Sequence, residues 1–231
     1  MKIEKLEPSR HKQGRWLAWL DDASIVRVGE GDVVSLGLYP GKELTGAEDE
    51  ALCVAGERFR LMERAVALLA QRPMSRKELL DKLCAPPRQK REKYPYDKLD
   101  DGPAPALLEA RRKALRERAE EVADRLTELG LLNDEEYARM VVRHYAAKGC
   151  GPRKLRDELY RRGVPREFWE DALEERAPDG DQVLELARRK LREKGPTREN
   201  LKKVSDYLAR RGYGWEEISA ALERIRAEWG D

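Results

Sequence analysis

The side chains best placed to do chemistry in this sequence are six cations carried by two copies of one pattern. The first copy runs from 154 to 163 and the second from 203 to 212, a spacing of 49 residues, and one further cation directly precedes each copy. If each copy is a helix with Leu155 or Val204 facing inward, a turn of 100° per residue places three cations of each copy on the outer side. These cations are Arg153, Lys154 and Arg161 in the first copy and Lys202, Lys203 and Arg210 in the second. A basic surface repeated in this way is suited to an acidic groove or a phosphate backbone.

A solvated helix face is the alternative interpretation of the same six cations. Asp157 and Glu158 offer local ion pairs, and exposed charges usually contribute little. The repetition of the arrangement is what favours a functional surface. Arg162 and Arg211 lie nearer the helix seam, where we expect them to satisfy carbonyls at the ends of helices.

Residues suited to catalysis are scarce. His11 and His144 are the only histidines, and no close set of ligands completes a tetrahedral metal site with Cys150. His144 is therefore expected to pack between helices. No glycine-rich loop of the phosphate-cradling or dinucleotide kind occurs in the sequence. We expect no catalytic residue, no bound metal and no cofactor.

The elements that must position the cations are predicted to be helices in tandem repeats. A third, fainter copy of the pattern occupies 75–83, and self-similarity of this kind indicates stacked units that cannot bury their apolar faces alone. Glycines after the apolar runs and prolines at first positions mark the helix ends. The expected helices are 57–71, 75–84 and 105–130, then 134–148, 152–162 and 165–176, and finally 181–194, 197–211 and 214–228.

The N-terminal part has a different pattern. Residues 15–45 predict strands in a hairpin or meander, with Trp16 and Trp19 in its core and a second strand pair reaching Leu38. Trp169, Trp215 and Trp229 are expected to lock adjacent helices. The predicted fold is mostly α, an elongated array of three tandem three-helix repeats with a small N-terminal β-hairpin or meander. Its parts are a strand-rich segment (1–55), repeat one (56–131, interrupted by a loop at 84–105), repeat two (132–177) and repeat three (178–231).

The distribution of charge and the absence of long apolar runs limit the classes of binding partner. Net charge is only +2, yet residues 139–166 hold nine basic against two acidic side chains, and 188–211 hold ten against three. The basic surfaces therefore belong to the repeats rather than to the chain as a whole. Three cysteines far apart, no secretory leader and no apolar run of about 18 residues indicate a reducing cytoplasm and no membrane partner.

Four local patterns follow one another on this framework. They are Ser75-x-x-Glu78-Leu79, Leu129-Gly130-Leu131-Leu132-Asn133-Asp134, Gly149-x-Gly151-Pro152-x-x-Leu155, and Tyr207-Leu208-x-x-Arg211-Gly212-Tyr213. Their order and content resemble the RecX family of bacterial recombinase regulators over about residues 57–226. The loop at 84–105 and the strand-rich N-terminal segment depart from the shared repeats.

The resemblance implies a non-enzymatic protein, expected to be a monomer, that lies in the helical groove of the RecA filament on single-stranded DNA. In that family such binding limits filament growth and lowers ATP hydrolysis, strand exchange and repressor cleavage, so roles in DNA repair, homologous recombination and the SOS response are implied. The resemblance brings no catalytic residue to this chain. The six cations are candidate contacts from helix geometry alone.

Three other functions stay open at this point. A direct DNA-binding helical-repeat protein without a recombinase partner predicts steep salt dependence on bare DNA. A structural adaptor predicts binding that depends on neither recombinase nor DNA. An enzyme is disfavoured because no catalytic constellation is present.

Overall fold

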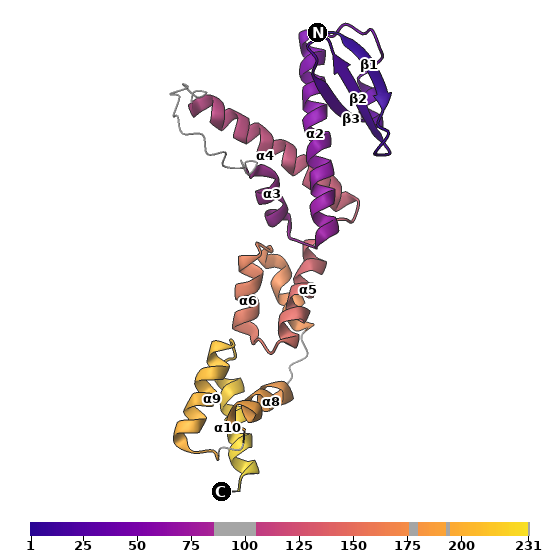
Figure 1. Cartoon of the computed structure of the whole chain (residues 1–231). Helices are drawn as coiled ribbons and strands as arrows, with labels where there is room; N and C mark the ends of the chain where they lie inside the picture. Colours follow the sequence, from indigo (N-terminus) through magenta and orange to yellow (C-terminus); the bar gives the residue numbers. More distant parts are fainter. Residues whose placement is uncertain (86–104, 176–179, 193–194, 231) are drawn as a thin grey trace, which may run out of the picture. The chain divides into compact units, whose positions relative to one another are not determined.

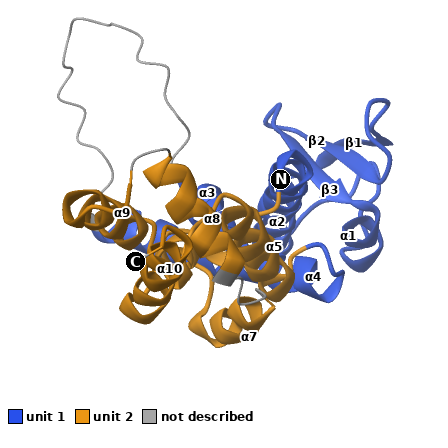
Figure 2. Ribbon diagram, turned by 90° about the horizontal axis from the view of Figure 1, so that it is seen from below, with its two compact units in different colours: residues 1–72, 79–131 blue, residues 73–78, 132–231 orange. Residues whose placement is uncertain are grey.

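The computed structural model describes residues 1–85, 105–175, 180–192 and 195–230 (Figure 1). Most of the predicted loop at 84–105, including its basic run from Arg88 to Lys93, lies outside these residues. The described chain forms two compact units, residues 1–72 with 79–131 and residues 73–78 with 132–231 (Figure 2). The predicted class, mostly helical with a small N-terminal antiparallel sheet, is confirmed. The division into four parts stays a prediction.

The first unit begins with a three-stranded antiparallel sheet. Its strands, in the order β1-β2-β3, are Ile3–Pro8, Arg15–Leu20 and Ile25–Gly29. Ala18 pairs with Leu6 on one side and Val26 on the other, and this face of β2 turns toward a core that includes buried Ile3. Trp16 packs against that core, as predicted, whereas Lys5 stacks over Trp19 instead. Strand β1 was not predicted, because Ile3 and Leu6 are three residues apart and so lack the two-residue apolar period of a strand; the pairing is irregular between Ile3 and Lys5.

The predicted strand from Val33 to Leu38 is wrong, because helix α1 (Glu30–Ser35) begins the segment. The Gly-Glu-Gly-Asp run resembles a hairpin turn, but the Asp32 carboxylate accepts a hydrogen bond from the Gly29 N–H at 3.0 Å. This bond satisfies a donor at the helix start and favours helix over turn. Val33 packs on the sheet core, while Val34 is left 76% exposed.

Helix α2 (Gly46–Gln71) is the longest element and begins earlier than the predicted start at 57. Thr45 caps it, and the Glu48 carboxylate accepts hydrogen bonds from the Thr45 N–H and hydroxyl, both at 2.9 Å. Leu52 and Ala55 enter the sheet core. Farther along, α2 contacts α4 (Pro105–Glu128). The capping box explains why the helix begins where the chain leaves the sheet.

The capping box predicts a measurable acid sensitivity. The Thr45 N–H and then Lys42 lower the pKa of Glu48 from 4.5 to about 2. A carboxyl with a depressed folded-state pKa stabilises the fold above its unfolded pKa and loses that contribution as pH falls toward the folded value. In thermal melts, we expect the melting temperature of wild type to exceed that of Glu48→Gln most above about pH 4.5. The two melting temperatures should converge as the pH falls to about 2. Glu50→Gln, an exposed neighbour, is the control, and a pH-independent difference for Glu48→Gln would contradict the assignment.

The second unit contains the helices that carry the repeated pattern. They are α5 (Asp134–Ala147), α6 (Pro152–Arg161), a 3-10 turn (Arg166–Phe168) with α7 (Trp169–Glu174), α8 (Gly180–Leu191), α9 (Arg198–Arg210) and α10 (Trp215–Glu228). Helix α3 (Arg76–Cys84) begins in this unit and ends in the first. One core lies among α5, α6 and α7 and a second among α8, α9 and α10. The predicted inward residues Leu155, Leu159, Val204 and Leu208 are all fully buried.

Three aromatic or histidine predictions have different outcomes. Trp169 locks α7 to α6, as predicted, since its indole N–H donates to the Val164 carbonyl at 3.0 Å. Trp215 is 70% exposed, whereas Ile218 in the same turn of α10 is buried, so the prediction that Trp215 locks adjacent helices is wrong. His144 is also exposed, with its ring edge-on to Tyr145, so its prediction as a packing residue is wrong.

Candidate functional site

Helices α6 and α9 are joined end to end by their main chains. The Gly151 N–H donates to the Arg211 carbonyl at 2.7 Å, and the Arg153 N–H donates to the Gly212 carbonyl at 3.1 Å. The last carbonyls of one helix and the first N–H groups of another normally lack partners, and here they satisfy each other. The negative end of one helix dipole also meets the positive end of the next.

Two glycines permit this close approach. A Cβ on Gly151 would lie 2.4 Å from the Gly212 carbonyl carbon, and one on Gly212 would lie 2.5 Å from the Lys154 nitrogen. Gly212 also has φ +89°, a left-handed conformation that ends α9. The Arg-Arg-Gly sequence at the end of α9 therefore forms part of the main-chain contact between α9 and α6.

A similar contact, made by a side chain rather than by the main chain, occurs where α6 ends on the start of α3, within the second unit. The Ser75 hydroxyl donates to the Arg162 carbonyl, and Gly163, at φ +68°, sits against the Lys77 stem. Asp134 accepts from the Arg76 N–H at 2.8 Å, and burial raises the pKa of this carboxyl despite that bond. At each junction, a glycine in the left-handed conformation thus lies against the first turn of an earlier helix that carries the repeated pattern. Gly212 lies against α6, and Gly163 lies against α3.

The structure leaves five of the six predicted cations exposed. Arg153, Arg161, Lys202, Lys203 and Arg210 are exposed, and Lys154 is half-buried because its main chain and stem meet Gly212. Arg161 pairs with Glu158 at 3.4 Å and Lys203 with Glu199 at 2.6 Å, yet their side chains stay 72% and 63% exposed. The Lys203–Glu199 pair is exposed on both sides and is easily exchanged for a partner's anions, whereas the Glu158 carboxylate that pairs with Arg161 is only 7% exposed.

The junction gathers three of these cations and spaces the others along the helices. Arg153 and Lys154 begin α6, and Arg210 ends α9, so all three flank the main-chain contact. Arg161 lies two turns away along α6, and Lys202 and Lys203 lie two turns away along α9. At 1.5 Å per residue each separation is about 10 Å.

Arg162 and Arg211 have structural roles, as expected, but different ones. Arg211 Nη1 donates to the carbonyls of Lys148 at 2.6 Å and Gly149 at 3.1 Å, which confirms its predicted bonding to terminal carbonyls. Those carbonyls belong to the end of α5 rather than to its own helix. Arg162 instead donates to the hydroxyls of Tyr137 and Tyr145, so its predicted bond to carbonyls is wrong.

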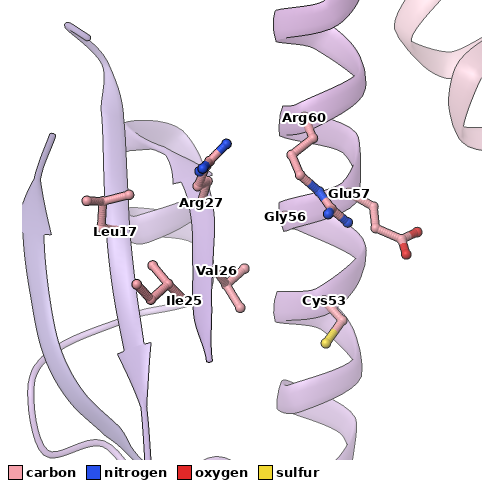
Figure 3. Close-up of a pocket in the computed structure, with 8 residues that line it drawn as sticks. All are labelled: Leu17, Ile25, Val26, Arg27, Cys53, Gly56, Glu57 and Arg60. Atoms are coloured by element: carbon pink, nitrogen blue, oxygen red, sulfur yellow. The ribbon is translucent and has the colours of Figure 1, made fainter. Parts of the chain in front are cut away.

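A groove of 490 Å³ in the first unit lies between β2, β3 and α2 (Figure 3). Its lining comes from the two strands and the helix, and Figure 3 labels Leu17, Ile25, Val26, Arg27, Cys53, Gly56, Glu57 and Arg60. Burial raises the pKa of the Cys53 thiol, so thiolate chemistry is disfavoured. All three cysteines are free. Within the described residues, no group of three His, Cys, Asp or Glu side chains could hold a metal ion, and no helix could cross a membrane.

A second groove, of 680 Å³, was not anticipated from sequence. The ends of α5 and α9 and one side of α8 line it, and its basic residues include Arg188, Arg189 and Arg211. The only sequence signal for this groove is the basic run from Arg188 to Lys190 at the end of a helix.

The sequence matches two family models. They are described as RecX, second three-helix domain, over residues 133–173, and RecX, third three-helix domain, over residues 179–222. The chain is 34% identical over 181 residues to the regulatory protein RecX of Xanthomonas axonopodis pv. citri (strain 306), covering 75% of this chain and 94% of that one. It is 33% identical over 162 residues to the regulatory protein RecX of Serratia proteamaculans (strain 568), covering 69% and 94%.

Solved structures share the fold. A crystal structure of regulatory protein RecX superposes with a TM-score of 0.68 at 22% identity and covers 97% of this chain and 98% of the other. The crystal structure of RecX from Lactobacillus salivarius gives a TM-score of 0.57 at 20% identity, over 74% and 97%. The first alignment extends over nearly the whole chain and therefore includes the N-terminal sheet.

Proposed function

Because the chain belongs to the RecX family of regulatory proteins, we propose that it binds in the groove of the RecA filament on single-stranded DNA and inhibits the recombinase. It would act in DNA repair and recombination, as a monomer in the cytoplasm, with no catalytic step of its own. The observation that carries the proposal is the pair of cation triplets on two helices joined end to end.

Inhibition follows from how such a surface binds. Each exposed cation contributes little by itself, but six on a fixed framework engage several filament subunits or phosphates together. The junction hydrogen bonds hold the spacing of the two triplets before binding, so the chain loses less conformational entropy when the complex forms. A ligand of fixed spacing favours the filament geometry it fits and opposes the changes in geometry that hydrolysis and growth require.

Binding to three targets tests the proposal. Labelled protein is titrated with RecA filaments on oligo-dT, with the same DNA alone and with DNA-free RecA, each at about 50 and 200 mM salt. We expect filament binding to persist at the higher salt and bare-DNA binding to be weak. Tight, salt-sensitive binding to bare DNA with no gain from RecA would instead identify a direct DNA-binding protein. Binding to none of the three targets would support an adaptor for another protein.

A further inference from the structure

We propose that the 680 Å³ groove at the end of α5 binds a phosphate group of a single-stranded nucleic acid through Arg189 and Arg211. This inference rests on the proposed function only for the identity of the strand, since the filament contains single-stranded DNA. The groove is lined by none of the six cations of the repeated pattern, although Arg211 directly follows Arg210. Its walls come from Ala147 to Gly149, from α8 and from Arg211 after α9.

Arg211 is held in place before any ligand arrives. Its Nη1 is fixed by two main-chain carbonyls, and its guanidinium carbon lies 4.9 Å from the Tyr207 ring centre. Gly149 makes this possible, because a Cβ there would lie 2.9 Å from Nη1. No described residue engages Nε or Nη2 of Arg211. A planar guanidinium with free donors is well suited to a phosphate, and its fixed position lowers the entropy lost on binding.

Arg189 supplies the second charge. Its neighbour Arg188 is already paired with Glu228, because Nε of Arg188 donates a hydrogen bond to the Glu228 carboxylate at 2.9 Å. Arg189 is exposed, and no carboxylate in the described part of the chain pairs with it. Glu185 also lines the groove, yet it forms no ion pair with either Arg189 or Arg211 among those residues. Among the described residues, neither of these two guanidinium groups therefore forms an ion pair with a carboxylate.

The shape of the groove favours a nucleotide chain over a small anion. A volume of 680 Å³ far exceeds one phosphate group, and Leu186 and Ala147 add apolar wall on which a sugar or base can rest. Contacts to phosphate carry no sequence information, so binding is expected to be independent of base sequence.

Salt-dependent binding to an oligo-dT strand tests the inference without recombinase. We compare wild type, Arg189→Gln and Arg189→Glu by fluorescence anisotropy between about 50 and 200 mM salt. Loss of one phosphate contact is expected to reduce the slope of log K against log salt by about 0.7, with a larger loss of affinity for Arg189→Glu. Arg226→Gln, which removes the same charge from an exposed site on α10, is the matched control and is expected to leave the slope unchanged.

Three other outcomes overturn the inference. Equal effects of Arg189→Gln and Arg226→Gln would show general electrostatics rather than a site. Displacement of the strand by dTMP at matched phosphate concentration would assign the groove to free nucleotides. If Arg189→Gln leaves bare-DNA binding intact but weakens binding to RecA filaments, the groove holds an acidic protein surface, and the proposed function still stands. Absence of filament binding by wild type would contradict the proposed function and leave the bare-DNA comparison valid.

Discussion

Gly151→Ala is expected to open the junction between α6 and α9 and to lower stability by about 2–4 kcal/mol. The new Cβ would overlap Gly212 at 2.4 and 2.5 Å and the Tyr213 nitrogen at 2.5 Å. These are main-chain atoms, so the helices must separate. Separation breaks two main-chain hydrogen bonds and withdraws Arg211 from the end of α5. The cost therefore combines lost bonds with newly unpaired groups.

Thermal unfolding and hydrogen exchange measure this effect. For a chain of this length, we expect the melting temperature to fall by about 5–15 °C, with faster exchange at the amides of Gly151 and Arg153. Gly214→Ala is the matched control, because its nearest contact would be an ordinary 3.6 Å to Glu217. Identical melts for the two variants would show that the junction contributes nothing.

Inhibition of RecA by Gly151→Ala shows whether the surface depends on the spacing of its cations or only on their charge. Gly151→Ala changes no charge, so a surface acting through charge alone would inhibit RecA as wild type does. A surface whose two triplets must keep their spacing would lose inhibition when the junction opens. We expect the second result.

Neutralising all six cations is expected to abolish inhibition while the fold survives. Replacement by Gln of Arg153, Lys154 and Arg161 together, or of Lys202, Lys203 and Arg210 together, should weaken filament binding on the order of 10–100-fold per triplet. Both triplets together should weaken it by about the product. Five of the six side chains are exposed, so stability should change little.

A matched variant controls for total charge. Gln at Arg10, Arg111 and Arg112 removes three exposed cations from the first unit, which is the same charge change as one triplet. Its inhibition of ATP hydrolysis should stay close to that of wild type. An equal loss in this control, or a loss from one Lys→Ala change as large as that from a triplet, would contradict a multivalent surface.

Local signals explain why the helices of the second unit were predicted well. Gly163 and Gly212 adopt a left-handed conformation that ends a helix, and Pro152 begins α6. One or two residues are therefore enough to predict each of these helix boundaries. Apolar residues such as Leu155 and Leu208 then indicate the inner face. The N-terminal segment lacks such signals. There, Asp32 decides between turn and helix through one hydrogen bond, and charged β1 is a strand only because it pairs with β2.

The candidate site was predictable only in part. Helix geometry identified the exposed cations, because their direction depends on their own helix alone. The junctions and the basic groove depend on residues far apart in sequence, such as Gly151 with Arg211 and Arg211 with Lys148. The repeat of Arg-Arg-Gly at a spacing of 49 residues hinted at a shared role for Arg162 and Arg211, yet their side chains bond differently. The exposure of Trp215 also had no local signal.

We propose that this RecX-family protein acts on the RecA filament rather than on DNA alone. The most direct test of this proposal is single-stranded-DNA-dependent ATP hydrolysis by the cognate RecA, titrated with this protein. We expect inhibition at amounts well below one protein per RecA subunit, at concentrations where bare DNA is hardly bound. Unchanged hydrolysis up to a full equivalent per subunit, or inhibition that appears only when the protein saturates the DNA, would contradict the proposal.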